Sequence, residues 1–133
     1  MIRHKLLLCA EGVVVDRVTN NASAFNILEQ LNFQNLPVAF PKMVILSCLE
    51  RDAGDPEKWE GKLRIDLAGS VIMDLPFEHN FHGMSRSRNL FTLGGLPITQ
   101  PGIMEISLVK DDKKETSYTI EIAVPPGPKV ETS

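Results

Sequence analysis

The sequence predicts an all-β fold, an antiparallel β-sandwich of about eight strands in two sheets, immunoglobulin-like or C2-like in type. Apolar and polar residues alternate over 104–108 and again over 118–124. A period of two indicates a strand with one buried and one solvated face. The charged run 110–115 between them has hairpin length, and turn signals rich in glycine and proline precede it. We therefore expect residues 89–124 to form the edge of the sandwich.

Shorter apolar runs predict the other strands. Residues 6–16 are rich in valine and leucine, and Gly12 indicates a bulge or bend partway along them. Residues 43–49 are apolar on both faces, which is typical of a central strand covered from both sides. Residues 63–67 alternate cleanly, and 71–75 form a further apolar run after a Gly-Ser break. Each of these segments is expected to be a strand.

Residues 22–33 fit two interpretations. Phe25, Leu28 and Leu31 have helical spacing, and Asn21 could cap a helix. Phe25, Ile27, Leu31 and Phe33 also fit the alternation of a strand. Glu29 is the one residue that does not fit it. The β-rich surroundings favour a strand, and the helix stays open as the alternative.

Length and composition indicate one globular domain. The chain has 133 residues, of which 43% are hydrophobic and 23% charged, ordinary values for a domain with a real core. We predict a single sandwich domain over 1–124 and a proline-rich flexible tail over 125–133. The formal net charge is −3, so the composition offers no electrostatic basis for binding nucleic acid.

The N-terminus superficially resembles a lipoprotein signal. Basic residues 3–5 precede an apolar run, but that run stops at Glu11, whereas a signal needs about 7–15 apolar residues. No stretch approaches the length of a transmembrane helix. These observations predict a cytoplasmic protein with no membrane association.

Two cysteines, Cys9 and Cys48, lie inside apolar runs. A disulfide between strands would be the first expectation in a secreted protein. Without a signal peptide, two buried reduced thiols are the preferred interpretation. Their spacing matches no metal or redox motif such as C-x-x-C.

Three segments carry a family resemblance: 8–16 (Leu-Cys-Ala-Glu-Gly-Val-Val-Val-Asp), 23–28 (Ser-Ala-Phe-Asn-Ile-Leu), and Leu96-Pro97 with Pro101-Gly102. Over residues 6–124 the chain resembles a bacterial family of small β-sandwich proteins known only as a domain of unknown function. The resemblance implies a strand rather than a helix over 22–33. It implies no catalytic residue and no cofactor.

Two histidines could carry chemistry. His79 and His82 could share a metal with Glu78 or Asp74, but no H-E-x-x-H signature supports a metal site. A triad of Ser85 or Ser87 with His82 and Asp74 can be written down, without a G-x-S-x-G elbow to support it. We therefore predict neither a metal site here nor an enzyme.

A C2-like sandwich raises the question of calcium. Two loops supply enough carboxylates: Asp52, Asp55 and Glu57 in one, and Asp111, Asp112 and Glu115 in the other. The same loops carry lysines and an arginine, which dilute any calcium site. Solvated loops that keep strand edges soluble are the preferred interpretation, and no cofactor is predicted.

Residues 76–88 show no periodicity and are expected to be a long loop, where function tends to reside. Apolar and arginine side chains mix there as they do in interface cores; these are Phe77, Phe81, Met84, Arg86 and Arg88. The alternative is that the two phenylalanines plug one end of the sandwich.

The sequence thus predicts a non-catalytic binding or assembly module, with a protein partner or self-association through this loop. Arg86 and Arg88 could also pair with a phosphate or an acidic partner. The runner-up is a calcium- or ligand-binding C2-like domain, and an enzyme comes third.

Overall fold

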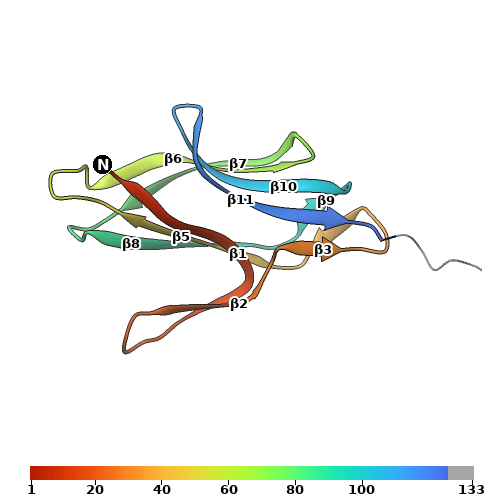
Figure 1. The fold of residues 1–133 in the computed structure, drawn as a ribbon, viewed down its shortest axis with the longest axis horizontal. Helices are drawn as coiled ribbons and strands as arrows, with labels where there is room; N and C mark the ends of the chain where they lie inside the picture. Colours follow the sequence, from red (N-terminus) through yellow and green to blue (C-terminus); the bar gives the residue numbers. More distant parts are fainter. Residues whose placement is uncertain (126–133) are drawn as a thin grey trace, which may run out of the picture.

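The computed structural model describes residues 1–125, and this part of the chain is all-β, as predicted (Figure 1). Its eleven strands are β1 (Arg3–Val15), β2 (Ala22–Ile27), β3 (Gln30–Asn32), β4 (Val38–Phe40), β5 (Met43–Glu50), β6 (Lys58–Leu67), β7 (Ser70–Asn80), β8 (Arg86–Leu93), β9 (Leu96–Ile98), β10 (Gly102–Lys110) and β11 (Lys113–Ala123). The expected number was about eight. β3, β4 and β9 have three residues each, too few for alternation to reveal. Except for Pro125, the predicted tail lies outside the described residues.

Two larger sheets form the layers of the molecule. One has the order β2-β1-β5-β8, the other β3-β11-β10-β6-β7, and β4 and β9 form a small third sheet. Side chains from both larger sheets share one core, including Ile45 of β5, Ile65 of β6 and Ile106 of β10. Each is fully buried. The core therefore lies between the two sheets, where their inward-facing alternate residues meet.

The segment 89–124 does not form one edge, because its strands belong to different sheets and only β8 lies at an edge of a larger sheet. β10 lies between β11 and β6 in the five-stranded sheet, and β8 belongs to the other sheet. Met104, Ile106 and Leu108 of β10 are buried as predicted, but Ser107 on the face predicted to be solvated is buried as well. The hairpin turn is only two residues, Asp111 and Asp112, both with positive φ, as a tight type I′ turn requires.

Residues 22–33 are extended, as preferred, but they form two strands in different sheets. β2 pairs with β1, whereas β3 pairs in parallel with β11. Asn26 adopts positive φ, and buried Leu28 lies where the chain crosses between layers. This crossover explains why no single alternation fits the segment. Phe25 and Ile27 are exposed rather than part of the core.

β1 is a long strand that changes partner near its middle. Its first half pairs with β5, Ala10 pairs with both Val44 and Ile27, and its second half pairs only with β2. The β1–β2 arm, residues 11–27, therefore departs from the rest of the sheet and folds back below it in the view of Figure 1. The irregular register falls between His4 and Leu6, not at Gly12. Gly12 lies under the Phe25 ring, which occupies the space of a Cβ.

β5 is the central strand that its composition predicts. It lies between β1 and β8, and both Ile45 on the core side and Leu46 on the other side are buried. Val44 and Leu46 are absent from the core cluster and point to the outer face of the sheet. The prediction of a strand covered from both sides is confirmed.

Residues 76–88 do not form one long loop. β7 continues through Pro76 to Asn80, β8 begins at Arg86, and only residues 81–85 connect them. Proline disrupts a central strand but is tolerated at a sheet edge, and β7 is an edge strand. Because the sequence does not reveal which strand is an edge, Pro76 ended the predicted strand too early.

Gly61 is the glycine that packing most restricts. A Cβ at this position would collide with the Trp59 ring and the Val109 carbonyl oxygen. We expect Gly61→Ala to lower the free energy of unfolding by about 1–3 kcal/mol, the usual cost of overpacking. Gly94→Ala is the matched control, since its Cβ would meet only the Pro41 oxygen at 3.5 Å. That variant should stay within about 0.5 kcal/mol of wild type in urea unfolding. Equal effects of the two substitutions would contradict this packing.

Candidate interaction groove

The five predicted interface residues separate into two groups. Phe81 is 1% exposed and belongs to the core, with the Arg51 guanidinium 5.5 Å from its ring centroid. Phe77 is half-buried between Trp59 and Phe91, at centroid distances of 5.2 and 4.9 Å. These two phenylalanines lie where the alternative interpretation puts them, packed at the end of the sandwich.

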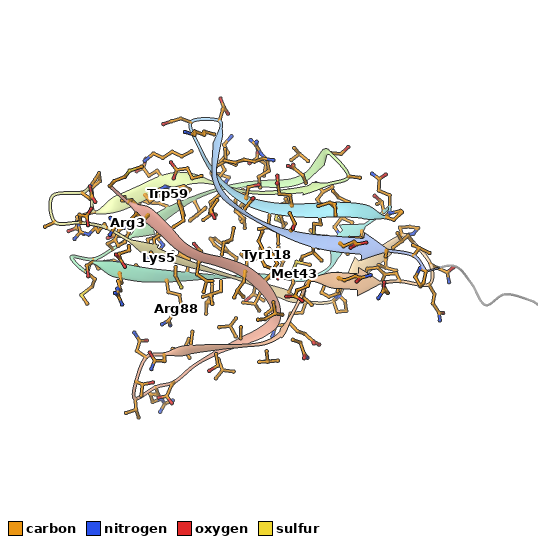
Figure 2. The ribbon with its side chains drawn as sticks, in the orientation of Figure 1. Arg3, Lys5, Met43, Trp59, Arg88 and Tyr118 are labelled. Atoms are coloured by element: carbon orange, nitrogen blue, oxygen red, sulfur yellow. The ribbon has the colours of Figure 1, made fainter. Side chains whose placement is uncertain are left out.

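Met84, Arg86 and Arg88 lie at the surface beside a groove. The groove has a volume of about 840 Å³. It is lined by residues of β1, β5, the β7–β8 connection, β8 and the tip of the β1–β2 arm: Lys5, Thr19, Asn20, Asn21, Cys48, Leu49, Glu50, Met84, Arg86, Ser87 and Arg88. In Figure 2, Arg88 projects from the sheet toward the arm. The structure therefore brings residues from distant parts of the sequence to one site.

The arm tip is tied to the sheet by Arg88. Its Nη2 donates a hydrogen bond to the Asn20 carbonyl oxygen at 2.6 Å. Within the tip, the Asp16 carboxylate accepts hydrogen bonds from the amides of Val18 and Thr19, and this holds the pKa of Asp16 below its ordinary value. The tip is thus an ordered turn, and Arg88 fixes its position over the outer face of the sheet.

The groove is basic although the whole chain is acidic. Lys5, Arg86 and Arg88 line it together with a single carboxylate, that of Glu50. A hydrogen bond from Arg3 at 2.7 Å holds the pKa of Glu50 below its ordinary value, so the carboxylate is ionised and satisfied. Arg86 approaches Glu50 only through Nε, at 3.3 Å. Its terminal nitrogens make no hydrogen bond to any described residue, so they are free to donate hydrogen bonds to an anionic ligand.

Within residues 1–125, the carboxylates of the two acidic loops do not gather into one cluster. Asp52 and Asp55 hold the Met1 amino group, and Asp52 also accepts a hydrogen bond from Arg3 at 2.8 Å. Glu57 pairs with Arg51 at 2.9 Å. In the other loop, Glu115 accepts hydrogen bonds from Trp59 and His4, while Asp111 and Asp112 form the turn. Over residues 1–125, no group of three His, Cys, Asp or Glu side chains is placed to hold a metal ion.

His79 and His82 lie in different surroundings, one buried and one exposed. His79 is buried on β7 and packs edge-on against Phe81, with ring centroids 5.0 Å apart. Burial lowers the pKa of His79. His82 is exposed in the turn that follows, where its amide donates to the Asn80 side chain. Asp74 pairs with Arg64 instead, at 3.6 Å. Within residues 1–125, no hydrogen bond or ion pair joins the side chains of the candidate metal ligands or those of the candidate serine triad.

The two cysteines are free thiols, as predicted, but they face opposite sides of their sheet. Cys9 is in the core, paired in register with Ile45, and burial raises its pKa to about 12. Cys48 is only half-buried, because it faces the groove opposite Arg88. The prediction that both thiols are buried is therefore wrong for Cys48.

Sequence comparison identifies the family of this chain. The sequence matches the Family of unknown function (DUF6941) over residues 5–123, nearly the whole of the described part. The chain belongs to this family. No curated protein matches it. Membership in DUF6941 confirms the predicted resemblance to a family of unknown function, and bacterial origin stays a prediction. No helix in the described part is long and apolar enough to cross a membrane.

Sequence reasoning missed most of the groove in this DUF6941 protein, since only Met84, Arg86 and Arg88 among its lining residues were predicted. Lys5, Asn20 and Glu50 are ordinary polar residues in three separate segments, and none carries a motif. The sequence did indicate that Arg86 and Arg88 lie together, because two arginines separated by one residue share a face of a strand. The arm that completes the site could not be found, since its position depends on a contact between residues 20 and 88.

Buried His79 should make the stability depend on pH. Below an ordinary pKa of about 6.5, the unfolded chain binds a proton that the folded chain resists. The free energy of unfolding should therefore fall as pH drops through that value, and level off below the folded pKa. His79→Leu should flatten this slope between about pH 7.5 and 5.5 in urea unfolding. His82→Asn, at an exposed turn position that suits asparagine, should retain it. An unchanged slope in His79→Leu would contradict the assignment.

Thiol labelling should separate the two cysteines. Cys48 should react in the native protein because it faces the groove, and Cys9 should react only after unfolding because the core covers it. Mass spectrometry of alkylated protein should show one modification under native conditions and two in denaturant. Cys48→Ser should abolish the native modification. Two rapid native modifications would contradict the burial of Cys9.

Proposed function

We propose that this chain is a non-catalytic protein-interaction module of the immunoglobulin-like or C2-like sandwich type. Its binding surface is the outer face of the β2-β1-β5-β8 sheet together with the arginine-lined groove. A protein partner, rather than self-association, is the proposed occupant. The observation that carries the proposal is the apolar outer face of this sheet.

Strand register defines that face. Leu8, Leu46 and Leu90 pair across β1, β5 and β8 and form one row. Neighbouring rows add Leu6 on one side and Ala10 with Val44 on the other, and Ala10 leads on to Ile27 of β2. None of these residues belongs to the core cluster or packs against it. Alternate residues of a strand point to opposite faces, so these side chains form one continuous outer surface.

The rim of this surface is open to solvent, whereas Ala10, Val44 and Leu46 at its centre are buried. Four of its large side chains range from 42% exposed at Leu90 to 51% exposed at Phe25, with Leu6 and Ile27 between them. A hollow of about 360 Å³ lies beside Phe25, between the arm and residues 40–42. Contiguous apolar area in water is unfavourable, and in soluble proteins it commonly marks an interaction site. Burial against a partner would remove that cost.

The polar surroundings also suit a protein partner. Arg86 and Arg88 lie at one end of the apolar rows, and arginine is enriched in interfaces alongside apolar side chains. The acidic loops already have cationic partners in Arg3 and Arg51. That pairing supports an interaction module over a calcium-binding C2-like domain. The net charge of −3 likewise favours protein over nucleic acid as the partner.

Charge introduced on the outer face should weaken partner binding. We expect Leu6→Glu combined with Ile27→Glu to weaken the affinity at least about tenfold, or about 1.4 kcal/mol, because burying each carboxylate is costly. Stability should change little, since both side chains are half exposed. Val71→Glu, at an exposed position on β7 of the other sheet, is the matched control and should bind normally.

The partner would be captured from an extract of the source organism, purified and titrated against each variant by calorimetry. Sedimentation velocity of the wild type tests self-association separately. Binding that Val71→Glu weakens and the double variant leaves unchanged would place the interface on the other sheet and overturn the proposal.

A further inference from the structure

β8 is an open strand edge. It pairs with β5 in unbroken antiparallel register from Arg86 to Leu93, and no other strand of the described chain lies on its far side. Apart from the pairing with β5, no backbone N–H or C=O group of β8 makes a backbone hydrogen bond within residues 1–125. No residue of β8 is fully buried, in contrast to β5. One row of its N–H and C=O groups is therefore free to pair with an added strand.

The other edges are protected. β7, at the edge of the second sheet, contains Pro76, which has no N–H to donate, and its pairing with β6 is irregular at Asp66. β2 is shorter and contains Asn26 at positive φ. β3 has only three residues. Proteins commonly block strand edges in these ways, and β8 has neither a proline nor a bulge.

The outer-face side chains of β8 specify a partner. Arg86, Arg88 and Leu90 alternate along this face, about 6.6–7 Å apart. A strand added to β8 would place its own alternate side chains directly opposite them. The Arg86 side chain is 83% exposed, and Lys5 adds positive charge to the same groove. In antiparallel pairing, an apolar residue followed by two carboxylates at alternate positions complements this row in charge and polarity.

We propose that β8 accepts an extended acidic segment of a partner protein as an additional antiparallel strand. Two carboxylates of that segment lie opposite Arg86 and Arg88, and an apolar side chain lies opposite Leu90. Backbone hydrogen bonds to the free edge of β8 supply affinity, and the arginines supply specificity. This inference rests on the proposed function, since it names how the partner engages the same sheet.

A synthetic peptide tests the strand addition directly. The probe is fluorescent, capped Thr-Leu-Thr-Glu-Thr-Glu-Thr, whose order matches β8 in antiparallel pairing, and binding is measured by fluorescence anisotropy. The same peptide with lysine in place of glutamate should bind at least about tenfold more weakly. Arg86→Glu should reverse this preference. Lys58→Glu, which removes an exposed cation on β6 in the other sheet, should not change it.

Methylation of peptide backbone nitrogens tests the hydrogen bonding itself. Adjacent residues of a paired strand direct their N–H groups to opposite sides, so methylation should abolish binding at every second position and be tolerated between. Equal tolerance at all positions, equal binding of the glutamate and lysine peptides, or no binding of either would overturn the proposal.

Failure of the strand addition is separable from failure of the proposed function. Leu6 and Ile27 lie on β1 and β2, away from β8. If Leu6→Glu with Ile27→Glu blocks the protein partner while no peptide binds β8, the interaction module stands and strand addition is wrong.

Discussion

Trp59 is the side chain on which the packing of the two sheets most depends. It is buried on β6, and its ring lies 5.2 Å from that of Phe77, which in turn lies 4.9 Å from Phe91 on the opposite sheet. Its Nε1 donates to Glu115 at 2.8 Å, and His4 Nε2 lies 2.8 Å from the same oxygen. Burial alone would raise the pKa of Glu115, but these hydrogen bonds outweigh it and hold that pKa below its ordinary value. One cluster thereby joins β1, β6, β7, β8 and β11.

That cluster packs between the two sheets, whereas the proposed binding surface is the outer face of the β2-β1-β5-β8 sheet. The β1–β2 arm is held over this face by the bond from Arg88 to Asn20. Beneath and beside it, apolar rows meet a basic groove on a chain whose net charge is negative. Apolar area supplies binding free energy, and localised charge selects the partner and orients its approach. In the proposed function, the two kinds of surface therefore contribute separately to recognition of the partner.

Local sequence patterns were sufficient to predict a strand and its buried side chains wherever the surroundings are uniform along that strand. Alternation in β10 correctly identified Met104, Ile106 and Leu108 as buried, and the apolar run of β5 correctly indicated a strand covered on both faces. Patterns were insufficient where the surroundings change along a segment. Residues 22–33 cross between sheets, and Pro76 lies within an edge strand, so neither presents a single period. The period of apolar residues reflects which side of a strand is buried. It therefore cannot identify a strand where the buried side changes along the segment.

By itself the sequence determined the all-β class, the main strands, the reduced cysteines, and the mixture of apolar and arginine residues near the end of β7 and the start of β8. These properties depend on neighbours within a few residues, where backbone geometry fixes which side chains share a face. Only the tertiary structure decided that Phe77 and Phe81 pack inside while Arg86 and Arg88 line a groove with Lys5 and Asn20. The contact between Asn20 and Arg88 joins residues 68 positions apart in sequence. Such contacts are set by how two sheets pack and an arm folds back, which no local spacing encodes.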